Sequence, residues 1–390
     1  MLRVIIILLL SFFSVNVLAE VNNADSQNSS NYATNYTNNN YYYNNTGNTC
    51  SCSTQSNYQI SKTPQHIALL VPLTGNLAGA GQAIQKGFMD AYHAAAADDQ
   101  PQQVDVIDTA ANTDIQAAYQ QAVQQGADFI VGPLDKLDVM ALSRNTAVNL
   151  PVLTLNYLAA EQTAPRNFFQ FGLSPYDEAR QAAADARQKN LQSALIIAPE
   201  SEWGRGVAQA FTDQWQALGG NITDQLFYRG DMNSYTKQMA NLLQVRQSAN
   251  RRIAPTRRHD FDVIFLAANP YSGRQLSALL KYDSAADVPV YATSLIYSGT
   301  QQPTLDEELN GITFFDVPWI FNTDNSNGNA RLYALGVDAY QVAMQLNRLS
   351  KTPGKSLNGD TGKLYLNDQQ RIVRQLTQAQ FQNGVAQPVQ

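Results

Sequence analysis

The chain has 390 residues, with 26 lysines and arginines against 32 aspartates and glutamates, so its formal net charge is −6. Its length predicts two domains with a sizeable core. The mild acidity excludes the basic face that nucleic-acid-binding proteins use, so we expect no nucleic-acid partner. Three histidines and two cysteines cannot supply a common zinc site or a disulfide framework, and we expect neither a metal nor a cofactor.

Residues 1–19 have the pattern of a secretory signal peptide. A short positive start precedes an apolar run over residues 4–13, and Val17 and Ala19 stand at the −3 and −1 positions of a cleavage site. The run is shorter than the ~20 residues of a spanning helix, which favours export with cleavage over an uncleaved anchor. Because Glu20 rather than cysteine follows the run, we expect no lipid anchor at this position, and outer-membrane association stays open.

Residues 20–63 form a tail of unusual composition. Twelve of residues 20–60 are asparagine and six are tyrosine, with almost no aliphatic side chains. Such a segment cannot bury enough apolar area to offset its chain entropy, and we expect it to be disordered. Cys50 and Cys52 lie near its end, where they either form a disulfide or remain exposed thiols.

Apolar runs that end at glycine or proline alternate with helical stripes from residue 64 onward. Short strands are predicted at residues 66–71, 104–107, 129–131 and 152–155, and helices at 84–95, 114–125 and 137–149. This alternation is typical of a parallel sheet covered by helices on both faces.

A crossover at residues 168–172 leads into a second unit of the same kind. Ser174 suits a helix N-cap, with Pro175 at the first helical position. Strands are predicted at 194–198, 222–227, 262–267, 288–292 and 312–317, helices at 204–218, 235–247, 270–282 and 331–349, and terminal strands at 359–366 and 371–381.

The predicted fold class is therefore α/β, with two Rossmann-like lobes and an interlobe hinge. We expect lobe 1 to cover about residues 64–170 plus 318–352. We expect lobe 2 to cover about residues 171–317 plus 353–390. A late helix and terminal strands imply that the chain crosses between the lobes more than once.

The sequence lacks the motifs of the common catalytic classes. No phosphate-binding P-loop, nucleophile elbow or zinc-protease motif occurs. A dinucleotide-binding pattern starts at Gly79 and Gly81 but fails, because Ile84 stands where the third glycine is required. Nothing in the sequence favours an enzyme.

Polar residues in the loops after strands are the candidates for ligand binding, because ligands of open α/β sheets lie at the carboxyl ends of strands. Thr74 and Gly75 stand at a helix start whose free N–H groups could hold an anionic group. The other cleft candidates are Asn156, Tyr176, Ser201, Asn269 and Ser294. Turn chemistry alone explains any one of these loops, whereas their repetition favours a binding cleft.

A basic cluster stands out in this acidic chain. It contains Arg246, Arg251, Arg252, Arg257 and Arg258, just before the strand predicted at 262–267. The simpler interpretation is a solvated loop. The alternative is a docking patch for an acidic protein surface, carried by the last four of these arginines.

Ten segments, in order along the chain, carry a family resemblance. They are residues 67–75, 81–88, 131–134, 155–156, 171–180, 215–220, 262–270, 291–294, 331–340 and 358–364. Residues 64–390 thereby resemble the C-terminal domain of the LppC family of penicillin-binding protein activators (LpoA-like proteins).

The resemblance implies the type I periplasmic binding protein fold. It also implies a non-enzymatic periplasmic regulator that binds a class A penicillin-binding protein, a bifunctional peptidoglycan synthase, and promotes peptidoglycan synthesis. The alternative is a solute-binding protein that closes two lobes on a small-molecule ligand in the cleft, such as an amino acid or a cell-wall fragment. A third possibility is a structural envelope protein whose tail makes the main contacts.

Overall fold

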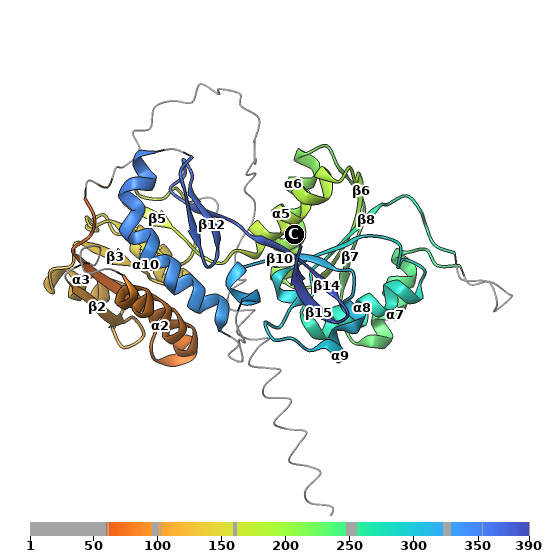
Figure 1. Cartoon of the computed structure of the whole chain (residues 1–390), viewed down its shortest axis with the longest axis horizontal. Coiled ribbons are helices and arrows are strands. Elements are labelled where there is room, and N and C mark those ends of the chain that lie inside the picture. The colour runs from red at the N-terminus through yellow and green to blue at the C-terminus, as the bar shows by residue number, and fades with distance from the viewer. Residues whose placement is uncertain are drawn as a thin grey trace, which may run out of the picture.

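The computed structural model describes residues 60, 62–95, 101, 103–158, 162–246, 256–322, 329–352 and 354–389. These residues form two α/β lobes, which confirms the predicted fold class (Figure 1). The predicted signal peptide, the tail up to Gln59 and both cysteines lie outside the described residues. Ile60 is only 4 % exposed and packs in the core of lobe 1, so the folded part begins before the expected residue 64.

Lobe 1 is built on a five-stranded parallel sheet with the strand order β2-β1-β3-β4-β5. Its strands are β1 (His66–Val71), β2 (Gln103–Asp108), β3 (Phe129–Val131), β4 (Val152–Thr154) and β5 (Phe168–Gln170). Its helices are η1 (Gly75–Leu77), α2 (Ala78–Ala94), α3 (Ile115–Gln124), α4 (Lys136–Ser143) and α10 (Ala330–Lys351). Successive side chains of β1 enter different cores, Leu69 on the α2 and α10 side and Leu70 on the α3 side. The strand is apolar throughout because helices cover both faces.

Helices α2 and α10 pack with their backbones in contact. A Cβ atom at Gly87 of α2 would lie 2.0 Å from the carbonyl oxygen of Tyr333. A Cβ atom at Gly336 of α10 would lie 2.1 Å from the carbonyl oxygen of Ile84. Only glycine permits this approach, which brings the late helix α10 into lobe 1 next to α2.

Lobe 2 is built on a seven-stranded sheet with the order β15-β14-β10-β9-β8-β6-β7. Its strands are β6 (Ser193–Pro199), β7 (Asn221–Tyr228), β8 (Val263–Leu266), β9 (Val290–Thr293), β10 (Thr313–Asp316), β14 (Thr377–Gln382) and β15 (Val385–Pro388). Its helices are α5 (Pro175–Gln188), α6 (Glu202–Ala217), α7 (Met232–Leu242), α8 (Pro270–Tyr282), η3 (Ser294–Ile296), α9 (Pro303–Asp306), η4 (Glu307–Leu309) and η5 (Pro318–Phe321). The first five strands along the chain are parallel, and the last two add antiparallel strands at one edge.

A small antiparallel sheet divides the expected lobe 2 range 353–390. It contains β11 (Ser356–Gly359), β12 (Gly362–Leu366) and β13 (Ile372–Gln375), and its apolar side chains lie in the lobe 1 core. Only residues 377–388 complete the lobe 2 sheet, while Ile320 of η5 lies in the lobe 2 core rather than in lobe 1. The chain thus crosses between the lobes before α5, between η5 and α10, and between β13 and β14.

Two predicted helices end earlier than expected, for local reasons. Helix α7 ends at Leu242 rather than at residue 247, because Gln244 adopts the left-handed conformation with a φ of 51°. Helix α4 ends at Ser143 rather than at residue 149, and the Asn145 side chain caps a turn by accepting from Ala147 N at 2.9 Å.

Candidate functional site

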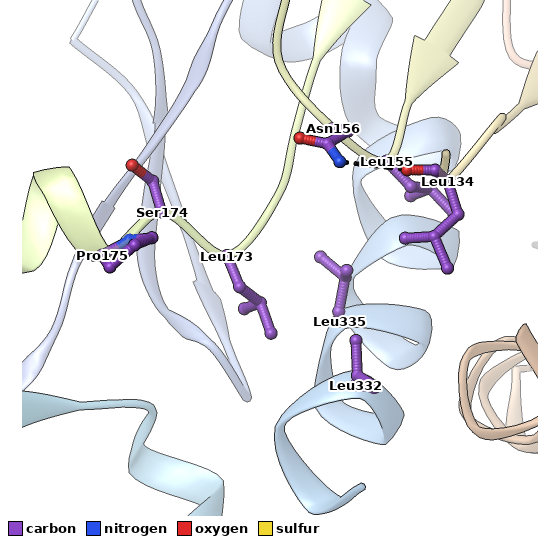
Figure 2. Close-up of a pocket in the computed structure, with 8 residues that line it drawn as sticks. All are labelled: Leu134, Leu155, Asn156, Leu173, Ser174, Pro175, Leu332 and Leu335. Carbon is purple, nitrogen blue, oxygen red and sulfur yellow. Dashed lines mark hydrogen bonds between the residues drawn. The ribbon is translucent and has the colours of Figure 1, made fainter. Parts of the chain in front are cut away.

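The junction of the lobes contains a small apolar cavity (Figure 2). It is lined by Leu134, Leu155, Asn156, Leu173, Ser174, Pro175, Leu332 and Leu335. Its volume is about 10 Å³, roughly the room that one water molecule needs. Sites for small molecules usually enclose ~300–1,000 Å³, so the cavity does not hold a ligand in this arrangement of the lobes.

The two polar side chains of this cavity bond within the chain. Asn156 donates from Nδ2 to the carbonyl oxygen of Leu134 at 3.1 Å and accepts from Tyr157 N at 2.9 Å. Ser174 accepts from Asp177 N at 3.3 Å, which confirms its predicted role as a helix N-cap. The other lining residues are five leucines and a proline, which offer no charged partner to the ammonium or carboxylate of an amino acid.

Two further cleft candidates are N-caps, as turn chemistry predicts. Ser201 accepts from Gly204 N at 3.1 Å at the start of α6. Asn269 accepts from Ser272 N at 2.9 Å at the start of α8. These bonds satisfy N–H groups that the first helical turn leaves without partners, so both side chains have a structural role.

Thr74, Gly75 and Tyr176 do not line the cavity either. The Thr74 hydroxyl donates to Asp108 Oδ2 at 2.8 Å, and Gly75 has a φ of 72°, which favours glycine. Tyr176 is 4 % exposed, and burial raises the pKa of its phenol above the ordinary value. Its ring packs so closely on α6 that a Cβ atom at Gly206 would lie 2.7 Å from it. Of the cleft candidates, only Asn156 borders the cavity.

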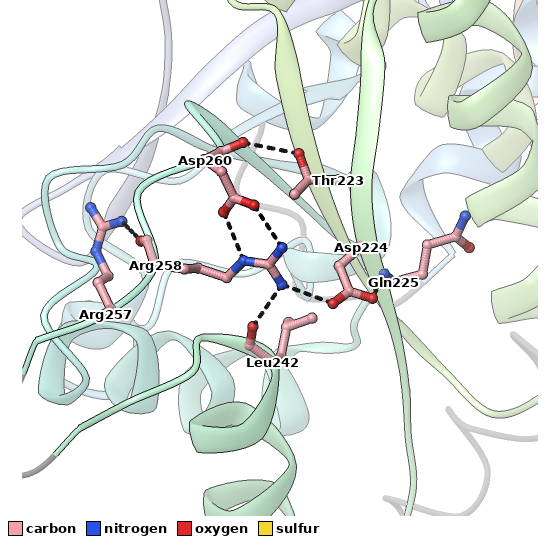
Figure 3. Close-up of polar contacts among 7 residues, drawn as sticks. All are labelled: Thr223, Asp224, Gln225, Leu242, Arg257, Arg258 and Asp260. Atoms are coloured by element: carbon pink, nitrogen blue, oxygen red, sulfur yellow. Dashed lines mark hydrogen bonds and ion pairs between the residues drawn. The ribbon is translucent and has the colours of Figure 1, made fainter.

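Arg258, a predicted docking residue, is held by two carboxylates at the edge of lobe 2 (Figure 3). Its guanidinium donates to both Asp260 oxygens at 2.7 and 2.8 Å and to Asp224 Oδ2 at 2.8 Å. The guanidinium keeps the pKa of Asp260 below its usual value by bonding the ionised form. A fourth bond, to the carbonyl oxygen of Leu242 at 3.2 Å, ties Arg258 to the end of α7.

Arg257 is also engaged within the fold rather than presented to a partner. It is 8 % exposed, donates to Asp287 at 2.9 Å and to the carbonyl oxygen of Ser284 at 2.7 Å, and lies 5.0 Å from the Phe261 ring centre. Arg251 and Arg252 lie outside the described residues. The structure therefore gives Arg257 and Arg258 a structural role that local charge alone could not reveal.

A cluster of four charged side chains, three of them buried, lies between the lobes and was not predicted. We call Glu178, Asp316, Arg331 and Arg374 the interlobe cluster. Asp316 of lobe 2 accepts from Arg331 of α10 through both oxygens, at 2.8 and 2.6 Å. Arg331 also donates to the carbonyl oxygens of Ser294 and Tyr297, at 3.2 and 3.0 Å. The cleft candidate Ser294 thus contacts the interlobe cluster through its backbone.

The remaining two members of the cluster, Glu178 and Arg374, come from opposite lobes. Glu178 of α5 accepts from Ser294 N at 2.9 Å and is 6 % exposed. Its burial and the nearby Asp316 raise its pKa to about 7, against the opposing effect of Arg374. Arg374 of β13 is 1 % exposed, and its Nε and Nη2 atoms have no hydrogen-bond partner among the described residues. No sequence motif marks these four positions, because their partners lie in different segments.

Within the described residues, no group of three or more histidine, cysteine or carboxylate side chains could hold a metal ion. In the same part of the chain, no helix has the length and apolar character needed to cross a membrane.

Comparison with known proteins gives a consistent set of relatives. The family model "LppC putative lipoprotein" matches residues 52–384. Penicillin-binding protein activator LpoA of Photobacterium profundum is 29 % identical over 348 residues, covering 81 % of this chain and 56 % of that protein. The activator LpoA of Haemophilus influenzae is 28 % identical, covering 85 % of this chain and 56 % of that protein. The chain therefore spans about half the length of the curated relatives it matches.

Solved structures agree with these relatives. The LpoA C-domain from Haemophilus influenzae, a regulator of PBP1A, matches with a TM-score of 0.69 and 28 % identity, covering 83 % of this chain and 99 % of that one. A "putative branched-chain amino acid ABC transporter" from Chromobacterium violaceum matches with a TM-score of 0.63 and 26 % identity, covering 81 % and 99 %. The fold is that of type I periplasmic binding proteins, as the resemblance implied.

Proposed function

This chain belongs to the LppC family, and on that basis we propose that it is a non-enzymatic regulator of peptidoglycan synthesis. It acts in the periplasm, where it binds a class A penicillin-binding protein and stimulates its synthase activity. The observation that carries the proposal is the match of both lobes to almost the whole of the LpoA C-domain. Regulation by contact requires that the chain binds the active conformation of the synthase more tightly than the inactive one.

The cavity between the lobes disfavours the alternative of a solute-binding protein. The solute-binding interpretation draws support from the fold shared with the Chromobacterium violaceum protein. However, a cavity of about 10 Å³ lined by five leucines has neither the room nor the charged groups for an amino acid. We therefore place the function at the outer surface of the lobes rather than in the cleft.

We propose that Arg251 and Arg252 contribute to docking on an acidic surface of the synthase. Charge complementarity between partners speeds association and suppresses wrong partners. Arg257 and Arg258 form ion pairs with Asp287, Asp224 and Asp260, so we assign the docking role to the other two arginines.

The test combines a binding measurement with an assay of glycan polymerisation. The chain from Glu20 onward and the class A synthase of the same organism are purified, and polymerisation of a lipid-linked peptidoglycan precursor is followed with and without the chain. We expect saturable binding and faster polymerisation. Absence of both would contradict the proposed function, and a small molecule retained by the purified chain in native mass spectrometry would favour the solute-binding alternative.

Charge reversal tests the docking residues separately. We expect Arg251→Glu combined with Arg252→Glu to slow association with the synthase, most strongly at low salt. The matched control is Arg348→Glu, at an exposed position of α10. Unchanged association of the double variant would remove these residues from the interface without removing the regulatory function.

A further inference from the structure

The interlobe cluster has its two signs of charge on different lobes. Lobe 1 provides the arginines, Arg331 from the first turn of α10 and Arg374 from β13. Lobe 2 provides the acids, Glu178 from α5 and Asp316 from the end of β10. Of these charges, Arg331 and Asp316 form an ion pair between the lobes, and Arg374 lies near enough to Glu178 to favour its ionised form.

One direct contact between the lobes is a bidentate ion pair. Arg331 donates from Nε and Nη2 to the two Asp316 oxygens at 2.8 and 2.6 Å, and the same Nη2 reaches the carbonyl oxygens of Ser294 and Tyr297. Bidentate pairs of this kind are short, strong and directional. One lobe 1 side chain therefore holds three points of lobe 2.

Opening the lobes would leave costly groups behind. Asp316 is 1 % exposed, so a shift of α10 that withdrew Arg331 would leave a buried carboxylate without its positive partner. Removing one member of a buried ion pair is strongly destabilising, because the remaining charge stays desolvated. Hinge motion in two-lobed proteins instead relies on a few loop residues that rotate freely.

We propose that the interlobe cluster is a fixed joint that holds the lobes in one arrangement, rather than a hinge that a ligand operates. The chain then presents both lobes to a partner as a single rigid surface. This inference goes beyond the proposed function, since it concerns the relative motion of the lobes and stands or falls without the synthase.

The test measures the distance between the lobes by pulsed electron paramagnetic resonance. Spin labels are attached at Leu137→Cys on α4 and Tyr282→Cys on α8, which are 68 % and 69 % exposed, after replacement of Cys50 and Cys52 by serine. For the full chain with its native cluster, we expect a single narrow distance distribution.

Three variants then distinguish the loss of the interlobe contacts from a general loss of stability. Arg331→Met keeps the aliphatic stem but removes every bond of the guanidinium, and Asp316→Asn removes the carboxylate charge. For both we expect a broader distribution with a second, longer distance. Arg348→Met, on the exposed side of the same helix, is the matched control and should leave the distribution narrow.

Several outcomes would overturn the proposal that the interlobe cluster is a fixed joint. Two distances in the chain with its native cluster would do so even if every variant failed to fold. The proposal would also be wrong if Arg331→Met kept a native circular dichroism spectrum and an unchanged narrow distance distribution. Equal broadening of the distance distribution in Arg348→Met would contradict it as well. These readouts do not depend on the synthase, so they separate the failure of this inference from the failure of the proposed function.

Discussion

Gly336→Ala should destabilise lobe 1, because Gly336 is the point where α10 touches α2 backbone to backbone. The added Cβ atom would lie 2.1 Å from the carbonyl oxygen of Ile84 and 2.9 Å from Phe88 N. An ordinary contact needs about 3.4 Å or more, so the two helices must separate or tilt. Separation would loosen the apolar residues that α10 packs against α2, including Leu335 and Ala339.

The magnitude follows from two opposing effects. Overpacking of a close-packed core costs ~1–3 kcal/mol. Alanine in a helix interior recovers ~0.5–1 kcal/mol relative to glycine. We therefore expect a net loss of about 1–2 kcal/mol, which for a lobe of this size corresponds to a fall in melting temperature of roughly 2–8 °C.

Urea unfolding followed by circular dichroism measures this change, with melting temperature as the second measurement. Gly79→Ala is the matched control on α2, because the nearest atom to its added Cβ would be Asn329 Nδ2 at 3.7 Å. We expect this control to be neutral or more stable by up to ~1 kcal/mol. A Gly336→Ala variant at least as stable as the parent would refute the argument from close helix contact.

Three further predictions concern buried polar groups. The raised pKa of Glu178, about 7 against an ordinary 4.5, means that its contribution to stability is fully present below pH 4.5 and is lost as pH rises through 7. The parent should lose up to about 3 kcal/mol of stability between acidic and mildly basic pH through this group, and Glu178→Gln should not show that loss. Equal pH profiles of melting temperature for the parent and Glu178→Gln would contradict this prediction. Asp338→Ala should lower the free energy of unfolding by ~2–4 kcal/mol, measured in urea, because the buried Asp338 accepts from Asp360 N at 2.8 Å and Thr361 N at 2.7 Å. Asp338→Asn should lower it less. A change within experimental error for Asp338→Ala would contradict this prediction. Arg258→Met should speed amide hydrogen exchange at residues 256–260. The control is Arg205→Met, which should not, because the Arg205 side chain is half-exposed. Equal effects of the two variants would show that Arg258 does not anchor residues 256–260.

The predicted elements succeeded where local signals define them. Helix α8 was predicted at its observed bounds, 270–282, and in the structure Asn269 caps it and Pro270 stands at its first position. The same local logic explains why Ser201 and Asn269 are N-caps, while their place in a ligand cleft stays a prediction. The early ends of α4 and α7 were missed, because a left-handed Gln244 ends α7 and a turn capped by Asn145 follows α4, while the apolar pattern continues in both.

The interlobe cluster, and the ion pairs of Arg257 and Arg258, could not be predicted from local signals. Glu178 and Ser294 are 116 residues apart in the chain, and Arg258 and Asp224 are 34 apart. A local charge count shows that arginines gather at residues 246–258, but it cannot show which carboxylates the fold brings to them. Arg257 and Arg258, for which a docking role was expected, form ion pairs within the chain.

The sequence by itself determined the alternation of strands and helices, and hence the α/β class with two lobes, because hydrophobic period and helix caps are local properties of the chain. It also carried the family resemblance, because that resemblance rests on ordered segments. Only the tertiary structure decided how residues 353–390 divide between the lobes and that four charges from four segments meet at the junction. These features depend on long-range packing and on the burial of charge, which arise only when distant segments leave water together.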